Sequence, residues 1–326
     1  MPARPFPDRA NLTICFAHVA YRLGERFAAR NTGMRAIEVR TRDDLDARIG
    51  AADVLVVSGL WRNELIARAG KLRFIQSIGA GVDQFDREGL RAREIRLASA
   101  QGVNERAVAQ HAMALILAMM RHIPAARDNQ RRRQWRGMIS DLTAREDELG
   151  GKTLLIVGLG RIGSRLAALA RAFGLRVIAT KRDPSKGADA GDRVVADGAL
   201  RDVLPEADIV ALTCPLTPQT EKLIGADALA AMKPSAYLIN VARGRVVDEP
   251  ALIAALEAGK IAGAALDCTV EEPLPEASPL WDFDNVLITP HTAGETRRYE
   301  DNVLDVLMEN LDRLWRGDNE LKNQIV

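Results

Sequence analysis

The chain alternates short apolar runs with amphipathic stretches. In the first hundred residues, three apolar runs predict β-strands, at residues 12–17, 53–59 and 72–79. Residues 21–30 and 61–70 are amphipathic, end on small residues or glycine, and predict helices between strands. Strands that alternate with helices are typical of βαβ units, so this region predicts a parallel sheet covered by helices.

A longer helix is expected from Asn104, a candidate N-cap, to a stop at Pro124. Apolar residues nearly encircle this helix, which predicts that it is buried, in part against another subunit. A polar and charged stretch follows at residues 125–152. The helix and this stretch separate the first alternation of strands and helices from a second one.

The second alternation predicts a parallel sheet of about six strands, followed by a final helix over residues 296–315. The six apolar runs lie at residues 153–158, 175–182, 208–215, 236–244, 261–267 and 285–291. The expected fold is therefore α/β, with two parallel sheets in two domains.

Composition narrows the class of protein. A length of 326 residues favours two domains, because single cores stop growing at about 250 residues. The net charge of +1, from 45 basic and 44 acidic residues, argues against a nucleic-acid or membrane-surface protein. Three scattered cysteines predict neither a disulfide framework nor a metal site, and no apolar run approaches the ~20 residues of a membrane span. We expect a soluble, cytoplasmic protein.

The motif "GLGRIG" places glycines at positions 158, 160 and 163, between an expected strand and an expected helix. Gly158 permits a tight turn, Gly160 lets the backbone approach a pyrophosphate, and Gly163 lets helix and strand pack closely. The helix N-terminus then offers free N–H groups to the phosphates. This arrangement predicts a dinucleotide site.

The end of the following strand discriminates between coenzymes. An acidic residue there usually binds the ribose hydroxyls of NAD, but this chain has Lys181 and Arg182, and Asp183 comes two positions late. Two cations would attract the 2′-phosphate of NADP, so we expect NADP(H) to be favoured over NAD(H). The alternative is that Lys181 and Arg182 are only exposed loop charges.

Three expected strands end in groups suited to a nicotinamide dehydrogenase. Arg243 offers a permanent planar cation for an anionic substrate, and His291 can give or take a proton near neutral pH. Glu272 could hold the imidazole and stabilise its charged form. Because open α/β sheets bind ligands at the carboxyl ends of their strands, we expect these side chains at one edge.

The motifs "GAGVDQFD", "VAQHAMALILAMMR", "GKTLLIVGLGRIG", "INVARGRVVDEPAL", "AALDCTVEEPLP" and "SPLWDFDNVLITPH" resemble the D-isomer-specific 2-hydroxyacid dehydrogenase family. The resemblance covers residues 50–315 and implies two Rossmann-like domains, one flavodoxin-like and one dinucleotide-binding, with the active-site cleft between them. It implies a homodimer joined largely through its coenzyme domains. It also implies a discontinuous substrate domain, residues 1–103 and 292–326, around an NAD(P)-binding domain, residues 104–291. The implied substrate is a small 2-oxo or 2-hydroxy acid of the glyoxylate and hydroxypyruvate class.

The resemblance also implies roles for individual residues. Arg243 would bind the 2-oxo acid, Glu272 would support the imidazole, and His291 would be the acid/base. Backbone N–H groups near Ala80 and Gly81 would hold the substrate carboxylate. The coenzyme would contact the phosphate turn, the adenosine loop and the nicotinamide end, which correspond to Arg161, Ile162, Cys214, Pro215, Thr220, Val241, Ala242 and Asp267.

Some residues depart from the family pattern or allow a simpler interpretation. Gln110, Thr269 and Thr292 replace residues that are common in the family, and Thr269 could alter the packing beneath Glu272. His111 is interpreted as a core or interface histidine. Trp135 either packs at a dimer arm or closes the partner's pocket.

Other functions remain open at this point. The same fold serves as a nucleotide-sensing corepressor, although we expect no long regulatory tail here. Phosphite dehydrogenases carry Lys where this chain has Ala80, and formate dehydrogenases carry Gln where it has Glu272. Neither of these two relatives matches as well as the small 2-oxo acid reductases.

Overall fold

The computed structural model describes residues 6–185 and 191–326. These residues form two compact units, and the chain crosses between the units twice. The first unit contains the residues up to Asn104 together with Thr296–Val326, and the second unit is Glu105–Glu295. Each unit has its own parallel sheet, which confirms the expected α/β fold of two parallel-sheet domains.

The sheet of the first unit has the order β2-β1-β3-β4-β5, and all its strand pairs are parallel. This is the flavodoxin-like order. Its strands are β1 (Thr13–Ala17), β2 (Arg35–Val39), β3 (Val54–Val57), β4 (Phe74–Ser77) and β5 (Arg96–Ala98). Its helices are α1 (Leu23–Ala28), α2 (Arg42–Arg48), α3 (Leu65–Arg68), α4 (Arg87–Ala92) and α11 (Tyr299–Arg316).

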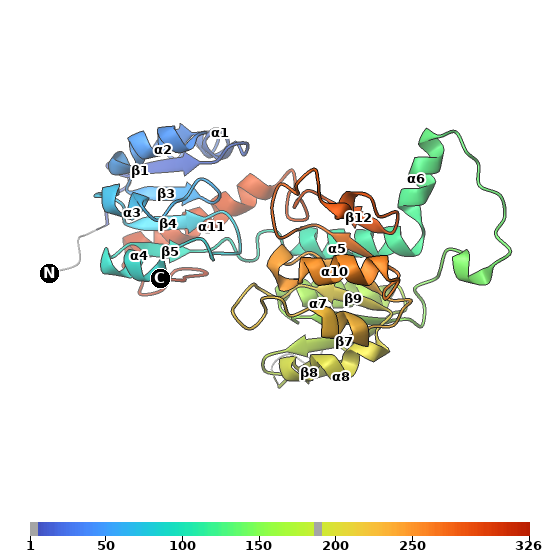
Figure 1. Cartoon of the computed structure of the whole chain (residues 1–326). Helices are drawn as coiled ribbons and strands as arrows, with labels where there is room; N and C mark the ends of the chain where they lie inside the picture. Colours follow the sequence, from blue (N-terminus) through green and yellow to red (C-terminus); the bar gives the residue numbers. More distant parts are fainter. Residues whose placement is uncertain (1–5, 186–190) are drawn as a thin grey trace. The chain divides into compact units, whose positions relative to one another are not determined.

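Helices cover both faces of this sheet (Figure 1). One face packs against residues of α1 and α11, such as Phe27 and Leu307. The opposite face packs against residues of α2, α3 and α4, such as Leu45 and Leu90. The central strands β1 and β3 are therefore buried along their whole length, which explains their continuous apolar runs.

The last residues of the chain pair with the edge strand β5. The backbone N–H of Leu97 donates to the carbonyl of Val326, and Ile325 N–H donates back to Leu97 at 2.8 Å. Ala98 and Gln324 form an antiparallel bridge beside these bonds. At the other edge, β2 exposes Arg35 and Glu38.

The sheet of the second unit has the order β12-β11-β10-β9-β6-β7-β8, again with parallel pairs. Its strands are β6 (Thr153–Val157), β7 (Arg176–Lys181), β8 (Arg193–Ala196), β9 (Ile209–Leu212), β10 (Tyr237–Asn240), β11 (Gly263–Leu266) and β12 (Val286–Ile288). Its helices are α5 (Glu105–Met120), α6 (Ile123–Arg131), α7 (Arg161–Ala172), α8 (Leu200–Val203), α9 (Ala226–Ala231) and α10 (Glu249–Glu257).

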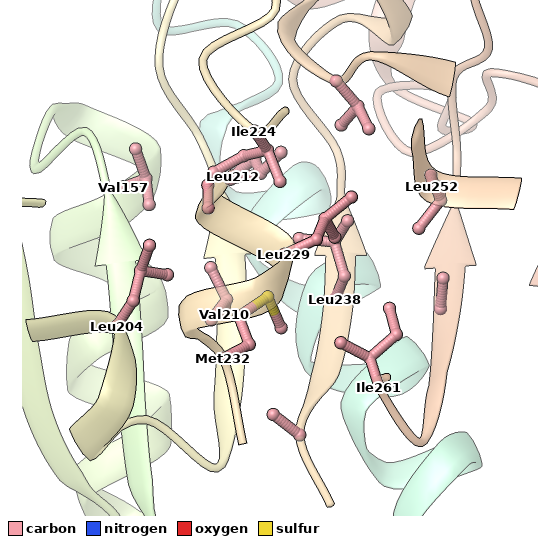
Figure 2. Packing of buried hydrophobic residues seen from close by; sticks show 14 of the residues in the cluster. Val157, Leu204, Val210, Leu212, Ile224, Leu229, Met232, Leu238, Leu252 and Ile261 are labelled. Carbon is pink, nitrogen blue, oxygen red and sulfur yellow. The ribbon is translucent and has the colours of Figure 1, made fainter. Parts of the chain in front are cut away.

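Two apolar layers enclose this sheet. On one face, residues of α8, α9 and α10 pack on β6, β9 and β10, and Figure 2 shows Leu229 and Leu252 with Val210 and Leu238. On the other face, α5 and α7 form the second layer. Each fully buried leucine or isoleucine contributes about 2 kcal/mol. The two apolar layers therefore fix the positions of the strands, and so of the loops that follow their carboxyl ends.

Some details of the predicted elements were wrong. Pro124 does not stop the long helix: α5 ends at Met120, His122 adopts a left-handed conformation (φ 50°), and Pro124 lies in the first turn of α6. Proline is tolerated there because the first N–H groups of a helix have no intrahelical partner. The second sheet has seven strands rather than about six, since β8 is a partly exposed edge strand with a short apolar core.

Helix α6 and the loop after it extend away from the second sheet (Figure 1). We call residues 123–146 the arm. The arm exposes four large apolar side chains, and Trp135 is 99% exposed; the other three are Ile123, Met138 and Leu142.

Candidate active site

Arg243, Glu272 and His291 follow three adjacent strands of the second sheet. β10 pairs with β11, and β11 pairs with β12, all parallel, so their carboxyl ends meet at one edge of the sheet. Arg243 follows β10, Glu272 follows β11 and His291 follows β12. The structure thus gathers the three side chains predicted to be catalytic at one strand-end region.

Glu272 and His291 form a direct pair. The Nδ1 atom of His291 lies 2.8 Å from Oε2 of Glu272, and both side chains are about half exposed. The hydrogen bond to Glu272 raises the pKa of His291 against the opposing effect of burial. Burial acts to raise the pKa of Glu272, but His291, the Thr269 N–H and the charge of Arg243 together outweigh it, and the pKa is lowered. The pair therefore favours an imidazolium beside a carboxylate.

Arg243 adds positive charge near this pair. Its charge lowers the pKa of both Glu272 and His291, although neither effect is the largest on those groups. One guanidinium nitrogen donates to the carbonyl of Ala242 at 2.7 Å. The side chain is half-buried. Its remaining N–H donors can form a bidentate pair of hydrogen bonds with an anion such as a carboxylate.

The loop that carries Arg243 is shaped by a buried asparagine. The Asn240 side chain accepts from Ala242 N–H and donates to the carbonyl of Arg243, both at 3.0 Å. Next to Arg243, a methyl group at Gly244 would lie 1.9 Å from the carbonyl oxygen of Thr269. Only glycine therefore lets the Arg243 loop pack against the loop that leads to Glu272.

Thr269, a departure from the family pattern, stabilises the Glu272 loop. Its hydroxyl donates to the carbonyl of Glu271 at 2.7 Å, and its backbone N–H donates to Oε1 of Glu272 at 3.2 Å. Thr269 is buried. It thus holds one oxygen of the carboxylate while His291 binds the other.

The glycine turn has the geometry that a dinucleotide requires. Gly158 has φ 98°, and a methyl group there would lie 2.7 Å from Cys214. A methyl group at Gly163 would lie 2.6 Å from the carbonyl oxygen of Gly158. In front of Gly160 there is open space, and Gly160 is the N-cap of α7. The protein therefore leaves room for a ligand where the helix offers its free N–H groups.

Two grooves flank this turn. One, of about 600 Å³, is lined by Gly160, Arg161, Lys181 and neighbouring residues of α7. The other, of about 550 Å³, runs from Gly158 past Lys181 and Arg182 to Cys214, Pro215 and Thr220. Asp183 and Asp197 also line the second groove. These two grooves thus place most of the candidate coenzyme residues beside β7.

The loop after β9 closes on itself. The Thr220 hydroxyl donates to the carbonyl of Pro215 at 2.6 Å and accepts from Thr217 N–H at 2.8 Å. Burial raises the pKa of the Cys214 thiol to about 11, which makes this cysteine a poor nucleophile. A lining role fits Cys214 better than covalent catalysis.

Five other predicted contact residues lie in three places. Val241 and Ala242 are buried in the loop after β10, and Ile162 lies in the first turn of α7. Ala80 and Gly81 belong to the first unit, in the loop after β4, where Ala80 is exposed. Their role in binding the substrate carboxylate stays a prediction.

Comparison with known proteins identifies the family of the chain. The family model for the NAD binding domain of D-isomer specific 2-hydroxyacid dehydrogenases matches residues 113–293, which include the glycine turn and all three strand-end residues. The chain belongs to the D-isomer specific 2-hydroxyacid dehydrogenase family. This confirms the resemblance noted in the sequence.

Several members of the family are similar over most of the chain. A glyoxylate reductase of Aeropyrum pernix is 39% identical over 78% of this chain and 76% of its own length. A D-3-phosphoglycerate dehydrogenase of Methanocaldococcus jannaschii is 37% identical over 85% of this chain but only 52% of its own length. The chain thus spans about half the length of the phosphoglycerate dehydrogenases that it matches.

The fold also matches a solved structure. The TT0316 protein of Thermus thermophilus aligns with a TM-score of 0.85 and 34% identity, over 97% of this chain and all of the other. Across residues 6–185 and 191–326, no helix is long and apolar enough to cross a membrane. The same residues contain no cluster of His, Cys, Asp and Glu suited to a metal ion.

Sequence reasoning missed the residues that support the site. Asn240 and Thr289 were not singled out, and Gly244 was read only as part of a motif. The sequence indicates a core or interface histidine at His111, and its ring contacts Thr289 next to the turn that carries His291. A polar residue at the end of an expected strand was the available signal for Asn240.

Proposed function

We propose that this protein is an NAD(P)H-dependent dehydrogenase that reduces a small 2-oxo acid to the D-2-hydroxy acid, and catalyses the reverse reaction. The observation that carries the proposal is the 2.8 Å pair of His291 and Glu272 beside Arg243. It combines a proton donor near neutral pH with a cation for an anionic substrate. Membership of the family supports the same chemistry.

In this proposal His291 moves the proton. Glu272 binds Nδ1, so Nε2 is the ring nitrogen left to face the substrate. In reduction, the imidazolium donates its Nε2 proton to the carbonyl oxygen, and in oxidation the neutral ring accepts the hydroxyl proton. Glu272 fixes the orientation of the ring and stabilises its charged form.

Arg243 would bind the carboxylate and the polarised carbonyl oxygen of the substrate. The backbone N–H groups near Ala80 and Gly81 would hold the same carboxylate. In this assignment residues 1–103 and 292–326 are the substrate domain, and residues 104–291 are the coenzyme domain.

The coenzyme would lie along the two grooves beside β7. The N-terminus of α7, with Gly160, Arg161 and Ile162, would hold the pyrophosphate. A reduced coenzyme held in this way would supply the hydride for C2 of the substrate. Val241, Ala242 and Asp267 would lie at its nicotinamide end. Lys181 and Arg182 line the groove where a 2′-phosphate would bind, which favours NADP(H).

Glyoxylate and hydroxypyruvate are the proposed substrates. The similarity to a glyoxylate reductase covers most of both chains, while the similarity to phosphoglycerate dehydrogenases covers about half of those longer proteins. The test measures NADH and NADPH oxidation with glyoxylate, hydroxypyruvate, pyruvate, phenylpyruvate and 3-phosphohydroxypyruvate. A protein that binds coenzyme but reduces none of them would contradict the proposal.

A single substitution tests the role of His291. His291→Ala should lower kcat by about two to four orders of magnitude, since it removes the proton donor. Binding of NADPH should be unchanged, because the coenzyme grooves do not include this side chain. A much smaller loss would show that another group moves the proton.

We also propose a homodimer in which the arm contacts the partner. The exposed side chains of Trp135 and Met138 support this, because monomers rarely expose several large apolar residues on one segment.

A further inference from the structure

The turn that carries His291 has an unusual backbone conformation. His291 has φ 54°, in the left-handed region that most L-residues avoid. Its backbone N–H donates to the carbonyl of Thr289 at 2.9 Å, which closes a tight turn just after β12. Strained conformations of this kind persist only where the surrounding structure supports them.

A buried carboxylate supports the turn. Asp267 is 2% exposed, and its carboxylate accepts from the backbone N–H groups of Thr292 and Ala293, both at 3.0 Å. The hydroxyl of Thr289 donates to the same carboxylate at 2.6 Å. Asp267 therefore binds the turn on both sides of His291.

His111 on α5 extends this network. Its Nε2 atom lies 3.0 Å from Oγ1 of Thr289 and 3.5 Å from Oδ1 of Asp267. Thr289 has one hydroxyl hydrogen and gives it to Asp267, so it can only accept from His111. The Nε2 atom of His111 must therefore carry a hydrogen. The network runs from a core helix, through Thr289 and Asp267, to the turn of the acid/base.

We propose that His111 and Thr289 are positioning residues, which hold the His291 turn through Asp267 so that the imidazole keeps its alignment with Glu272. Neither residue need touch the substrate. The proposal rests on the proposed function only in taking His291 as the acid/base. The structural part, alignment of the imidazole by a distant histidine and a threonine, stands on the hydrogen bonds alone.

Loss of the network has a distinct signature. The charged groups that face His291 are Glu272, Asp267 and Arg243. The hydrogen bond to Glu272 is the largest cause of the raised pKa of His291, so a looser turn should lower that pKa toward its ordinary value. A merely structural role for Thr289 or His111 would change thermal stability without this change in titration.

Two matched pairs of variants test the proposal. Thr289→Val removes the hydroxyl, whereas Thr289→Ser keeps it. His111→Phe removes the ring donor, whereas His111→Gln keeps an N–H donor. We expect Thr289→Val and His111→Phe to lower kcat by about 10- to 100-fold with little change in KM, since misalignment of a reacting group has effects of this size. The conservative variants should stay near wild type.

The pH dependence and NMR complete the test. With Thr289→Val, the high-pH limit of the reduction rate should move to lower pH. If wild type reduces no 2-oxo acid, the proposed function fails, but an NMR titration of His291 still tests positioning in wild type and Thr289→Val. Four histidines make the assignment tractable, with His291→Gln as reference. An unchanged His291 titration in both Thr289→Val and His111→Phe would overturn the inference.

Discussion

At the scale of single residues, the site depends on how neighbours change the chemistry of one histidine. Glu272 binds Nδ1 of His291 and raises its pKa, while the charge of Arg243 opposes this effect. In the proposed mechanism reduction needs the imidazolium, so we expect the rate to fall as pH rises through the pKa of His291. A raised pKa therefore extends reduction to higher pH.

Glu272→Gln should narrow this pH range. Glutamine can still accept a hydrogen bond but carries no charge, so the pKa of His291 should fall and the high-pH limit of reduction should move to lower pH. We expect kcat near neutral pH to fall by about two orders of magnitude. The pH dependence of kcat/KM measures the change. Glu271→Gln, at the exposed neighbouring position, is the control and should behave as wild type. If the high-pH limit of reduction does not move in Glu272→Gln, Glu272 has no part in proton transfer.

Lys181 is the residue on which coenzyme choice depends in our proposal. Lys181→Asp should lower kcat/KM for NADPH by about 10- to 100-fold, because hydrogen bonds to charged groups contribute about 1.5–3 kcal/mol. The value for NADH should change much less. Lys260→Asp makes the same charge change just before the N-terminal end of β11. This control should leave the ratio of kcat/KM for NADPH to kcat/KM for NADH unchanged. Equal losses with both coenzymes would refute a role in binding the 2′-phosphate.

At the scale of elements, the site forms because parallel strands end together and their loops pack closely. Long apolar runs made β1, β3, β4, β6 and most strands of the second sheet predictable. The mostly exposed strand β2, the three-residue strand β5 and the partly exposed edge strand β8 were not, because exposed or brief strands lack a continuous apolar run. The break between α5 and α6 depends on the left-handed turn at His122, and no glycine marks that turn.

The support of the site was harder to predict than the site itself. The sequence predicted that three side chains would lie at one edge of the sheet, because each follows an expected strand: Arg243, Glu272 and His291. The contact of Thr289 with His111 joins residues that lie far apart in the chain, and it depends on the rotation of α5 about its axis. The packing of Gly244 against Thr269 depends on loop paths that residue types do not specify.

Gly244→Ala tests how closely the two loops must pack. The added methyl would lie 1.9 Å from the Thr269 carbonyl oxygen, and the backbone on both sides must move. We expect a loss of about 1–3 kcal/mol in the free energy of unfolding, with a large fall in kcat as Arg243 and Glu272 separate. Thermal denaturation and steady-state kinetics measure the two effects. Gly150→Ala, where a methyl meets nothing within 4 Å, should change neither. Wild-type kinetics in Gly244→Ala would show that the loops can adjust.

At the scale of the whole molecule, two units have separate cores, and the chain crosses between them near Asn104 and Thr296. The arm belongs to the second unit and presents its apolar residues to solvent. Burying these side chains in a dimer would remove apolar surface from water and so stabilise the dimer relative to the monomer.

If the arm forms the proposed dimer, we expect wild type to be dimeric and the double variant Trp135→Ser, Met138→Ser to be monomeric. Light scattering after size-exclusion chromatography gives the mass directly. Phe173→Ser removes an exposed apolar side chain outside the arm and should leave the mass unchanged. A dimer that persists in the double variant would place the interface elsewhere.

The two edges of the first sheet avoid unwanted strand pairing by different means. β2 carries the charged residues Arg35 and Glu38, which discourage another strand from adding to it. β5 is shielded by the chain's own last residues, because Leu97 exchanges backbone hydrogen bonds with Ile325 and Val326. Deleting residues 323–326 would leave the backbone groups of this edge unpaired. The expected consequence is aggregation by edge-to-edge addition of strands. We therefore expect residues 323–326 to keep the protein soluble as well as to complete the fold.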